Sequence, residues 1–216
     1  MTARNIASFI GIAIGLMGLG IDFWIIMGSP PVDIDGNAVE RSMLGQFVYF
    51  WAFFTHLTNL GLVLFYLAEL TGWRWLSALR EPRWRASMAG MIVLVMVFFH
   101  FMLAPYYTFT GGLLVSNYLL HYVAPIIFLL WWFLLIPHGS LRYSDLPWML
   151  VPGLIYVVFV LTRGALVNDY PYAILNVSKA GYGGVAVGVL IILAAVAVFC
   201  TLLVFIDGLL RRRTTA

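Results

Sequence analysis

The sequence predicts an all-α polytopic membrane protein, with six transmembrane helices in one bundle and both termini in the cytoplasm. The first reason is composition: 63% of the residues are hydrophobic and only 10% are charged, whereas soluble domains carry about 25% charged residues. The second is that several apolar segments approach or exceed the roughly 20 residues that a helix needs to cross a bilayer. The predicted spans are 6–27, 46–68, 86–104, 113–136, 148–167 and 184–206, in a single domain over 1–216.

The first span is predicted to be a retained helix rather than a signal peptide. Its apolar core is longer than a signal peptide requires, and no small-x-small cleavage site precedes Gly28. Pro30 and Pro31 end this helix, because proline cannot continue a helical ladder. After the second span, the inner loop 71–85 mixes tryptophans with arginines, which is typical of an interfacial anchor.

The third span, 86–104, ends before Pro105, and Glu81-Pro82 starts either this helix or a short helix before it. An uncharged outer loop leads to the fourth span, and an inner loop leads to the fifth. The outer loop 168–183 holds Tyr170-Pro171-Tyr172, which we expect to form a shaped turn. The sixth span contains Cys200, the only cysteine, so neither an internal disulfide nor a cysteine metal cluster can form.

Basic residues set the predicted orientation. With the N-terminus inside, only Arg41, Arg163 and Lys179 of the twelve lysines and arginines fall outside, which leaves nine on the cytoplasmic side. This excess is the positive-inside pattern of multi-pass membrane proteins. A pI near 9.1 could suggest nucleic-acid binding, but the arginines lie at helix ends, as membrane orientation requires, and this excludes that interpretation.

Polar side chains inside the spans point to function, because a buried polar group is costly in lipid. In the second span, Thr55, Thr58 and Asn59 share one helix face, and His56 begins an adjacent stripe. In the fourth span, Asn117 and His121 lie four residues apart on one face. Two helices therefore offer a hydroxyl and an imidazole at comparable depth.

A threonine and a histidine in a water-poor site predict nucleophilic catalysis. A hydroxyl is a weak nucleophile until a base takes its proton. Either Asn59 or Asn117 could orient the imidazole or donate to an oxyanion. Asp22 is the one intramembrane acid at a suitable depth, and its role is left open. The other candidates for substrate binding or orientation are Thr58, His56, His100, Tyr156 and Arg163.

Structural interpretations stand beside these. A membrane threonine often bonds to its own i−4 carbonyl, and asparagine often joins helices. His121 could equally be a packed core histidine. Arg163 has two interpretations: an ion pair with Asp22, or a partner for a substrate carboxylate.

Three stretches of the sequence resemble a known family. They are Phe54-Thr55-His56-Leu57-Thr58-Asn59-Leu60, then His121-Tyr122-Val123-Ala124-Pro125, and then Thr162-Arg163-Gly164-Ala165-Leu166 followed by Tyr170-Pro171-Tyr172. Together they are similar to bacterial relatives of the androgen-induced-gene family of membrane proteins. The resemblance implies six transmembrane helices in the bacterial inner membrane.

The animal members of that family are threonine hydrolases that cleave fatty-acid esters of hydroxy fatty acids. By resemblance, Thr55 is the nucleophile and His121 the base, acting on a lipid or acyl-ester substrate without a cofactor or metal. The chain departs from the animal pattern at Thr58, where those proteins carry an acid, and the interval from His121 to Pro125 is one residue shorter. These departures leave the substrate open, and the sequence does not predict the oligomeric state.

Two other functions are compatible with the sequence. One is a transporter or receptor for a small solute, since intramembrane acids, arginines and histidines occur in such pathways. The other is an electron-transfer protein with haem held by His56, His100 or His121. The positions of these histidines lack the paired spacing expected for two haems.

Overall fold

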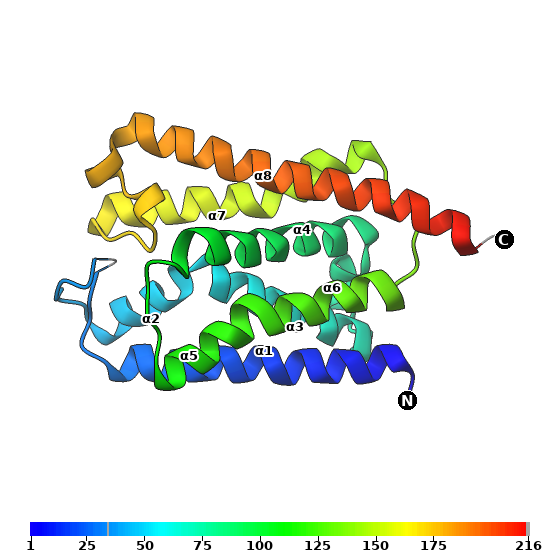
Figure 1. Cartoon of the computed structure of the whole chain (residues 1–216), viewed down its shortest axis with the longest axis horizontal. Coiled ribbons are helices and arrows are strands. Elements are labelled where there is room, and N and C mark those ends of the chain that lie inside the picture. The colour runs from blue at the N-terminus through cyan, green and yellow to red at the C-terminus, as the bar shows by residue number, and fades with distance from the viewer. Residues whose placement is uncertain (34, 215–216) are drawn as a thin grey trace.

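The computed structural model describes residues 1–33 and 35–214. Helices make up 81% of the chain, and the described residues form no strand, which confirms the all-α fold class. Figure 1 shows the helices running along a common direction. The α-helices are α1 (Ala3–Gly28), α2 (Met43–Ala52), α3 (Phe54–Thr71), α4 (Pro82–Phe98), α5 (Gly111–Tyr118), α6 (Ala124–Leu135), α7 (Leu146–Val167) and α8 (Val177–Thr214). The short helices are η1 (Arg74–Arg80), η2 (Phe99–Leu103), η3 (Leu119–Val123), η4 (Tyr143–Asp145) and η5 (Ala173–Leu175).

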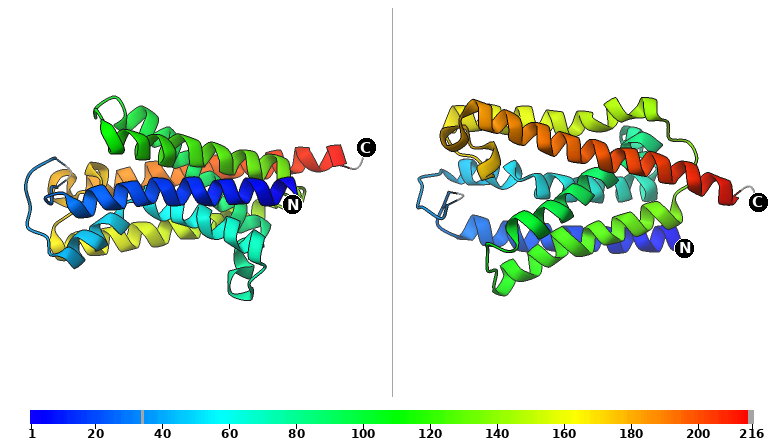
Figure 2. Two further views of the ribbon diagram at one scale, coloured as in Figure 1. Left: turned by 90° about the horizontal axis from the view of Figure 1, so that it is seen from below. Right: turned by 45° about the horizontal axis from the view of Figure 1, so that its top comes forward.

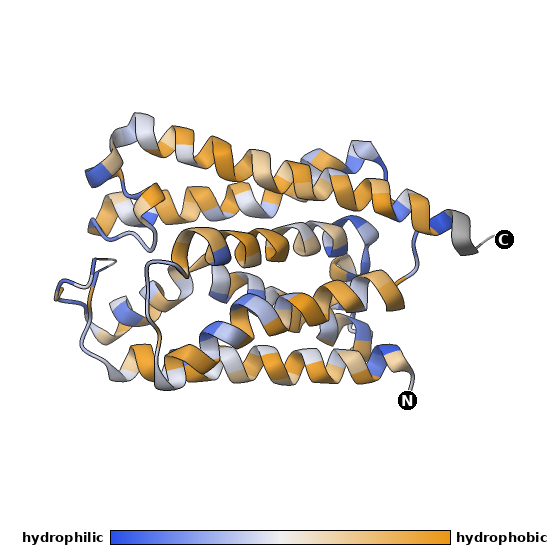
Figure 3. Cartoon of the chain, viewed as in Figure 1, coloured by the Kyte–Doolittle hydropathy of each residue, from blue (hydrophilic) through white to orange (hydrophobic). Residues whose placement is uncertain are grey.

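The described part of the chain has five helical stretches that are long and apolar enough to cross a membrane, and six if the bent pair of α2 and α3 counts as one span. Apolar residues cover most of every long helix, while polar residues gather at the loops and helix ends (Figure 3). The protein is therefore a multi-pass membrane protein. Both termini lie at the same end of the bundle, called the termini end below, and the other end is called the loop end (Figure 2).

The second predicted span is the main difference between sequence and structure. The sequence predicted one helix over 46–68, but the structure has two helices that meet at a 74° bend at Phe53. No proline or glycine marks this bend. It is held by side chains that satisfy the backbone groups freed there: Tyr156 donates to the Ala52 carbonyl at 3.0 Å, and the Phe54 N–H donates to the Tyr172 hydroxyl at 3.0 Å.

The bent pair nevertheless runs the full length of the bundle. At the loop end, Gln46 of α2 donates to the Ile26 carbonyl of α1 at 2.9 Å. At the termini end, Glu69 of α3 pairs with Arg4 at 2.9 Å and with Arg85 at 2.6 Å. These contacts at opposite ends show that α2 and α3 together reach from one end of the bundle to the other.

A π-helical turn interrupts the fourth span. Pro125 has no N–H, so the i→i−4 bond to the His121 carbonyl is missing, and the Ala124 N–H instead bonds to Leu119 five residues back. The turn η3 carries His121, and a second π turn, η2, carries Phe99 and His100. Such turns shift the direction of the side chains relative to a regular helix and are frequent at functional sites.

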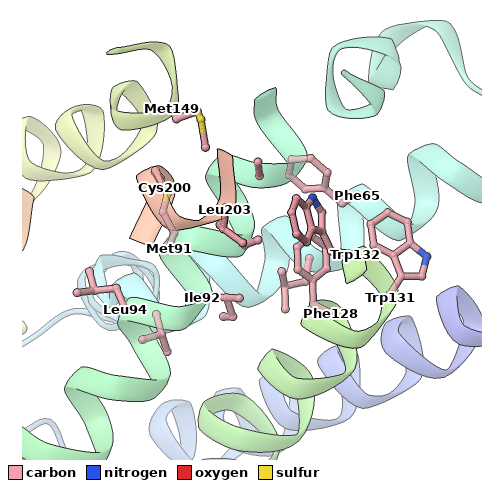
Figure 4. Close-up of a cluster of buried hydrophobic side chains, with 14 of the residues drawn as sticks. Phe65, Met91, Ile92, Leu94, Phe128, Trp131, Trp132, Met149, Cys200 and Leu203 are labelled. Carbon is pink, nitrogen blue, oxygen red and sulfur yellow. The ribbon is translucent and has the colours of Figure 1, made fainter. Parts of the chain in front are cut away.

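The hydrophobic core lies among α3, α4, α6 and α8, and the close-up in Figure 4 shows its largest side chains. Phe128, Trp131 and Trp132 of α6 meet Met91 and Ile92 of α4 there. On the other side of α3, α1 approaches closely because Gly11 faces Tyr66, and a Cβ at Gly11 would collide with that ring. This packing fixes α3 between α1 and α4.

Candidate functional site

Thr55 and His121 meet inside the bundle. The Thr55 hydroxyl oxygen lies 3.3 Å from Nε2 of His121, and the two residues are only 9% and 8% exposed. This distance is at the long end of the hydrogen-bond range, as is common in catalytic pairs before a substrate tightens them. The sequence placed both residues at similar depth, and the packing of η3 against α3 brings them face to face.

The hydrogen bonds of His121 assign its tautomer. Its Nδ1 lies 3.1 Å from the backbone carbonyl of Asn117, which can only accept, so Nδ1 carries the proton. The lone pair of Nε2 then faces the Thr55 hydroxyl, as a general base requires. The imidazole also stacks on Phe99, with ring centroids 3.8 Å apart. Asn117 thus orients the imidazole through its backbone, while its side chain donates to the Leu113 carbonyl at 2.7 Å.

The bend at Phe53 places Thr55 in the first turn of α3. The first amides of a helix point away from it unpaired and carry the positive end of its dipole. No side chain of α3 caps them; instead the Tyr172 hydroxyl accepts from the Phe54 N–H and interacts with the amide and side chain of Thr55. Burial raises the pKa of Tyr172 above its ordinary value of 10.0, so this hydroxyl keeps its proton at neutral pH.

Tyr172 is a site residue that sequence reasoning missed. The Tyr170-Pro171-Tyr172 stretch was predicted only as a shaped turn, and the signal in the sequence was the turn itself. The turn follows α7 and folds back over the bend of the second span, which hydropathy did not reveal.

A second polar network lies beside the Thr55–His121 pair. Nε2 of His56 lies 3.1 Å from a carboxylate oxygen of Asp22, and Nδ1 donates to the Phe50 carbonyl at 2.6 Å. The Ser116 hydroxyl donates to the other oxygen of Asp22. Asp22 therefore pairs with His56 rather than with His121, and the Thr55–His121 pair has no carboxylate as a third member.

The prediction that Arg163 pairs with Asp22 is wrong. Arg163 bonds to the Asp169 carboxylate at 2.7 Å, and the same carboxylate accepts two bonds of 2.9 Å from Arg41. Arg163 sits near the end of α7, where the chain turns back, and the acid that follows it six residues later is closer than Asp22 can be. Burial alone would raise the pKa of Asp169, but the hydrogen bonds and charges of the two guanidinium groups outweigh it and hold this pKa below 3.8.

The remaining candidates have structural partners. Thr58 donates to the Phe54 carbonyl at 2.8 Å, the back-bonding that was open as an alternative. Asn59 donates to the carbonyls of Thr55 and Leu120 and so ties α3 to η3 next to the Thr55–His121 pair. His100 is exposed and bonds to the Tyr122 hydroxyl at 3.1 Å, so it lies away from Thr55.

Two cavities converge on the Thr55–His121 pair. The first, called the apolar chamber, is a narrow space among α3, α4, α7 and α8. The second, called the polar chamber, is the roomier of the two and contains Asp22, His56 and Asn117 in its wall. The residues that line both chambers are Thr55, Phe99, Leu103, His121 and Tyr172.

The described residues show no group of three His, Cys, Asp or Glu side chains arranged to hold a metal ion. His56 and His121 each have both ring nitrogens bonded to protein groups, so neither offers a free nitrogen to haem iron as arranged here.

The fold and the site together define a class: a helical multi-pass membrane protein with a buried threonine–histidine pair at the junction of two chambers. Comparisons with protein-family models, with curated proteins and with solved structures found no match to this chain.

Proposed function

We propose that this protein is an intramembrane lipid-ester hydrolase, related to the androgen-induced-gene family, in which Thr55 is the nucleophile and His121 the base. The observation that carries the proposal is the 3.3 Å contact between the Thr55 hydroxyl and the Nε2 lone pair of His121. The substrates are acyl esters, the class that includes the fatty-acid esters of hydroxy fatty acids implied by the family resemblance.

The reaction follows the chemistry of serine hydrolases. The Thr55 oxygen attacks the ester carbonyl carbon while its proton passes to Nε2 of His121. The tetrahedral oxyanion collapses, the bond to the alcohol oxygen breaks, and that oxygen takes the proton from His121. A water molecule then gives a proton to His121 and attacks the acyl-threonine, which releases the fatty acid and restores the Thr55 hydroxyl.

The bend at Phe53 supports the proposal because it brings an oxyanion donor to Thr55. The Tyr172 hydroxyl accepts from the Phe54 N–H and keeps its own proton to donate, and the helix dipole favours negative charge at this position. Pre-oriented donors of this kind usually contribute the largest single part of the rate enhancement.

The apolar chamber supports an acyl substrate. Its wall is formed by aliphatic and aromatic side chains such as Leu94, Val157 and Ile192, and it reaches Thr55 directly. The acyl chain of a membrane lipid already resides in the hydrocarbon region, so it can move between helices to Thr55 without crossing water, and an apolar wall replaces its lipid surroundings.

Active-site labelling tests the proposal. A fluorophosphonate reacts with an activated hydroxyl, so we expect mass spectrometry to find the label on Thr55 of the purified protein. The label should vanish in Thr55→Ala and weaken in His121→Ala. Thr201→Ala is the matched control, because Thr201 is a membrane-helix threonine that only bonds to its own Ala197 carbonyl. A folded protein that stays unlabelled at Thr55 would contradict the proposal.

The buried Asp22–His56 pair favours one other candidate, a binding or transport site for a small solute in the polar chamber. Solute binding that survives in Thr55→Ala, together with uptake into vesicles, would support that function over hydrolysis.

A further inference from the structure

The two chambers divide an ester substrate into two halves, and this division rests on the proposed function. Thr55 lies where the chambers meet, so an ester carbon at Thr55 leaves one half of the molecule in each chamber. The apolar chamber has Thr55, His121, Tyr156 and Tyr172 as its only side chains with polar atoms, which suits an unsubstituted acyl chain. The alcohol half then occupies the polar chamber.

The polar chamber also lies toward the loop end. Tyr107, Phe109 and Pro171 come from the connections at that end and form part of its wall. The alcohol released when the acyl-threonine forms therefore departs through the chamber at the loop end of the bundle. This direction suits a leaving group that is more soluble in water than the acyl chain.

The donors of this chamber are the Tyr107 and Tyr172 hydroxyls and one N–H of the Asn117 amide, and the group at its centre, the Asp22–His56 pair, offers only acceptors. Both nitrogens of His56 are bonded, one to Phe50 and the other to Asp22. Each oxygen of Asp22 receives one hydrogen bond, and a carboxylate oxygen can accept two. The Asn117 amide donates to Leu113, which leaves its oxygen as an acceptor.

The position of the proton between His56 and Asp22 does not change this conclusion. If His56 carries it, Asp22 is a carboxylate that accepts. If Asp22 carries it, the proton lies along the 3.1 Å contact to His56 and not in the chamber. In both arrangements the chamber presents acceptor oxygens to a ligand, and those oxygens bind hydroxyl groups.

The charges of the lining residues also decide whether the alcohol half of the substrate can carry a carboxylate. None of the residues that line either chamber, all of them described by the structure, is a lysine or an arginine. Arg163 and Arg41, two of the three basic residues predicted on the outer side, are bound to Asp169 and lie outside both linings. A free carboxylate in the polar chamber would face the Asp22–His56 pair, which has no net charge in either arrangement of the proton and whose His56 donors are already used. Burying a carboxylate there without a free cationic partner is strongly unfavourable.

We propose that the preferred substrates are neutral esters whose alcohol half carries free hydroxyl groups, as in an acylglycerol, rather than esters whose alcohol half carries a carboxylate. The hydroxyls donate to Asp22 and Asn117, and the acyl chain fills the apolar chamber. Hydrolysis yields a fatty acid and a polyol, with water supplying the oxygen of the acid.

Competing substrates with one acyl chain test this selectivity. The purified full chain in nanodiscs is given palmitoylglycerol, the palmitate ester of a hydroxystearic acid, and the methyl ester of that same compound. We expect kcat/KM for palmitoylglycerol to exceed that for the free acid at least about tenfold, with the uncharged methyl ester in between. Equal or faster turnover of the free acid would overturn the inference.

An acceptor-to-donor variant tests the cause. Asp22→Asn keeps the shape of the side chain but replaces one acceptor oxygen with an N–H donor that a carboxylate can accept from, so the ratio between palmitoylglycerol and the free acid should fall about tenfold. Asp35→Asn is the matched control, because Asp35 is an exposed acid paired with Lys179 in the loop region. If Asp22→Asn does not fold, the selectivity of the wild-type protein decides alone.

The two proposals fail differently. Turnover of all three esters that persists in Thr55→Ala would remove the proposed function. Turnover that needs Thr55 but prefers the free acid would keep the hydrolase and remove only the selectivity.

Discussion

The Thr55–His121 pair depends on one backbone carbonyl. Because Asn117 accepts from Nδ1, His121 is held with its lone pair toward Thr55, yet the imidazolium formed during attack gains no carboxylate partner. In serine hydrolases the acid both fixes the tautomer and stabilises that charge. Here the carbonyl fixes the tautomer, and Asp22 bonds to His56 and Ser116 rather than to His121.

Tyr172 gives a prediction at the scale of single residues. Tyr172→Phe removes the hydroxyl beside the α3 amides, so we expect kcat to fall about a hundredfold with KM little changed, since the donor acts on the oxyanion and not on the bound ester. Steady-state kinetics on a soluble chromogenic ester measures both constants. Tyr170→Phe is the matched control, because the Tyr170 ring packs on Gly164 and the substitution preserves that ring.

A rise in KM alone, or an equal loss in both tyrosine variants, would show that the Tyr172 hydroxyl does not stabilise the oxyanion. A thermal unfolding curve for each variant checks that both are folded under the assay conditions, since Tyr172→Phe also removes the acceptor of the Phe54 N–H at the bend.

At the scale of elements, the site depends on a connection rather than on a helix. The turn after α7 carries Asp169 and Tyr172 three residues apart. Asp169 is fixed by Arg163 of α7 and by Arg41, which precedes α2, and Arg41 also stacks on Tyr49 with its guanidinium carbon 3.6 Å from the ring centroid. This arrangement joins the start of the bent pair to the turn that holds Tyr172.

The lowered pKa of Asp169 makes this connection sensitive to acid. A carboxyl whose pKa is lower in the folded state contributes stability above its ordinary pKa of 3.8, and this contribution is lost as the pH falls through the lowered value. We therefore expect the melting temperature of the wild-type protein to fall when the pH drops from about 5 to about 3. Asp169→Asn should melt lower at pH 5 and show a smaller further loss. Calorimetry across this range measures both, and parallel pH curves for the two proteins would contradict the role of Asp169.

The elements also show which parts of the fold the sequence predicts. Apolar length identified the spans, because crossing a bilayer constrains every residue of a helix. The bend at Phe53 was not predictable, since it depends on Tyr156 and Tyr172, more than a hundred residues away, which satisfy the freed backbone groups. Periodicity placed Thr55 and His121 at similar depth, but only the π turn before Pro125 and the packing of η3 on α3 decide that they meet.

The sequence also did not predict which ionisable residues form pairs. Asp22 and Arg163 are both inside or near the predicted spans, and opposite charges at similar depth suggested a pair. The structure gives each a different partner, His56 and Asp169, because lateral position in the bundle matters as much as depth. Depth follows from counting residues along one helix, whereas lateral position depends on how all the helices pack.

At the scale of the whole molecule, the broken span decides the topology. If α2 and α3 cross the membrane as one span, the chain crosses six times and both termini share one side, which agrees with their common end in the structure. The excess of basic residues at that end predicts that it is cytoplasmic. If the pair entered and left on one side, five crossings would place the termini on opposite sides.

Cysteine labelling distinguishes these topologies. Ala38→Cys and Ser77→Cys place thiols at exposed positions on either side of the bent pair, in the connection before α2 and in η1 after α3. Cys200 can stay, because it is buried among apolar side chains. In intact spheroplasts, an impermeant maleimide should label Ala38→Cys, while Ser77→Cys should react only after the membrane is permeabilised. Labelling of both cysteines from outside would mean that α2 and α3 do not cross the membrane. The reversed pattern would place the termini on the outer side, together with Glu69, Arg4 and Arg85.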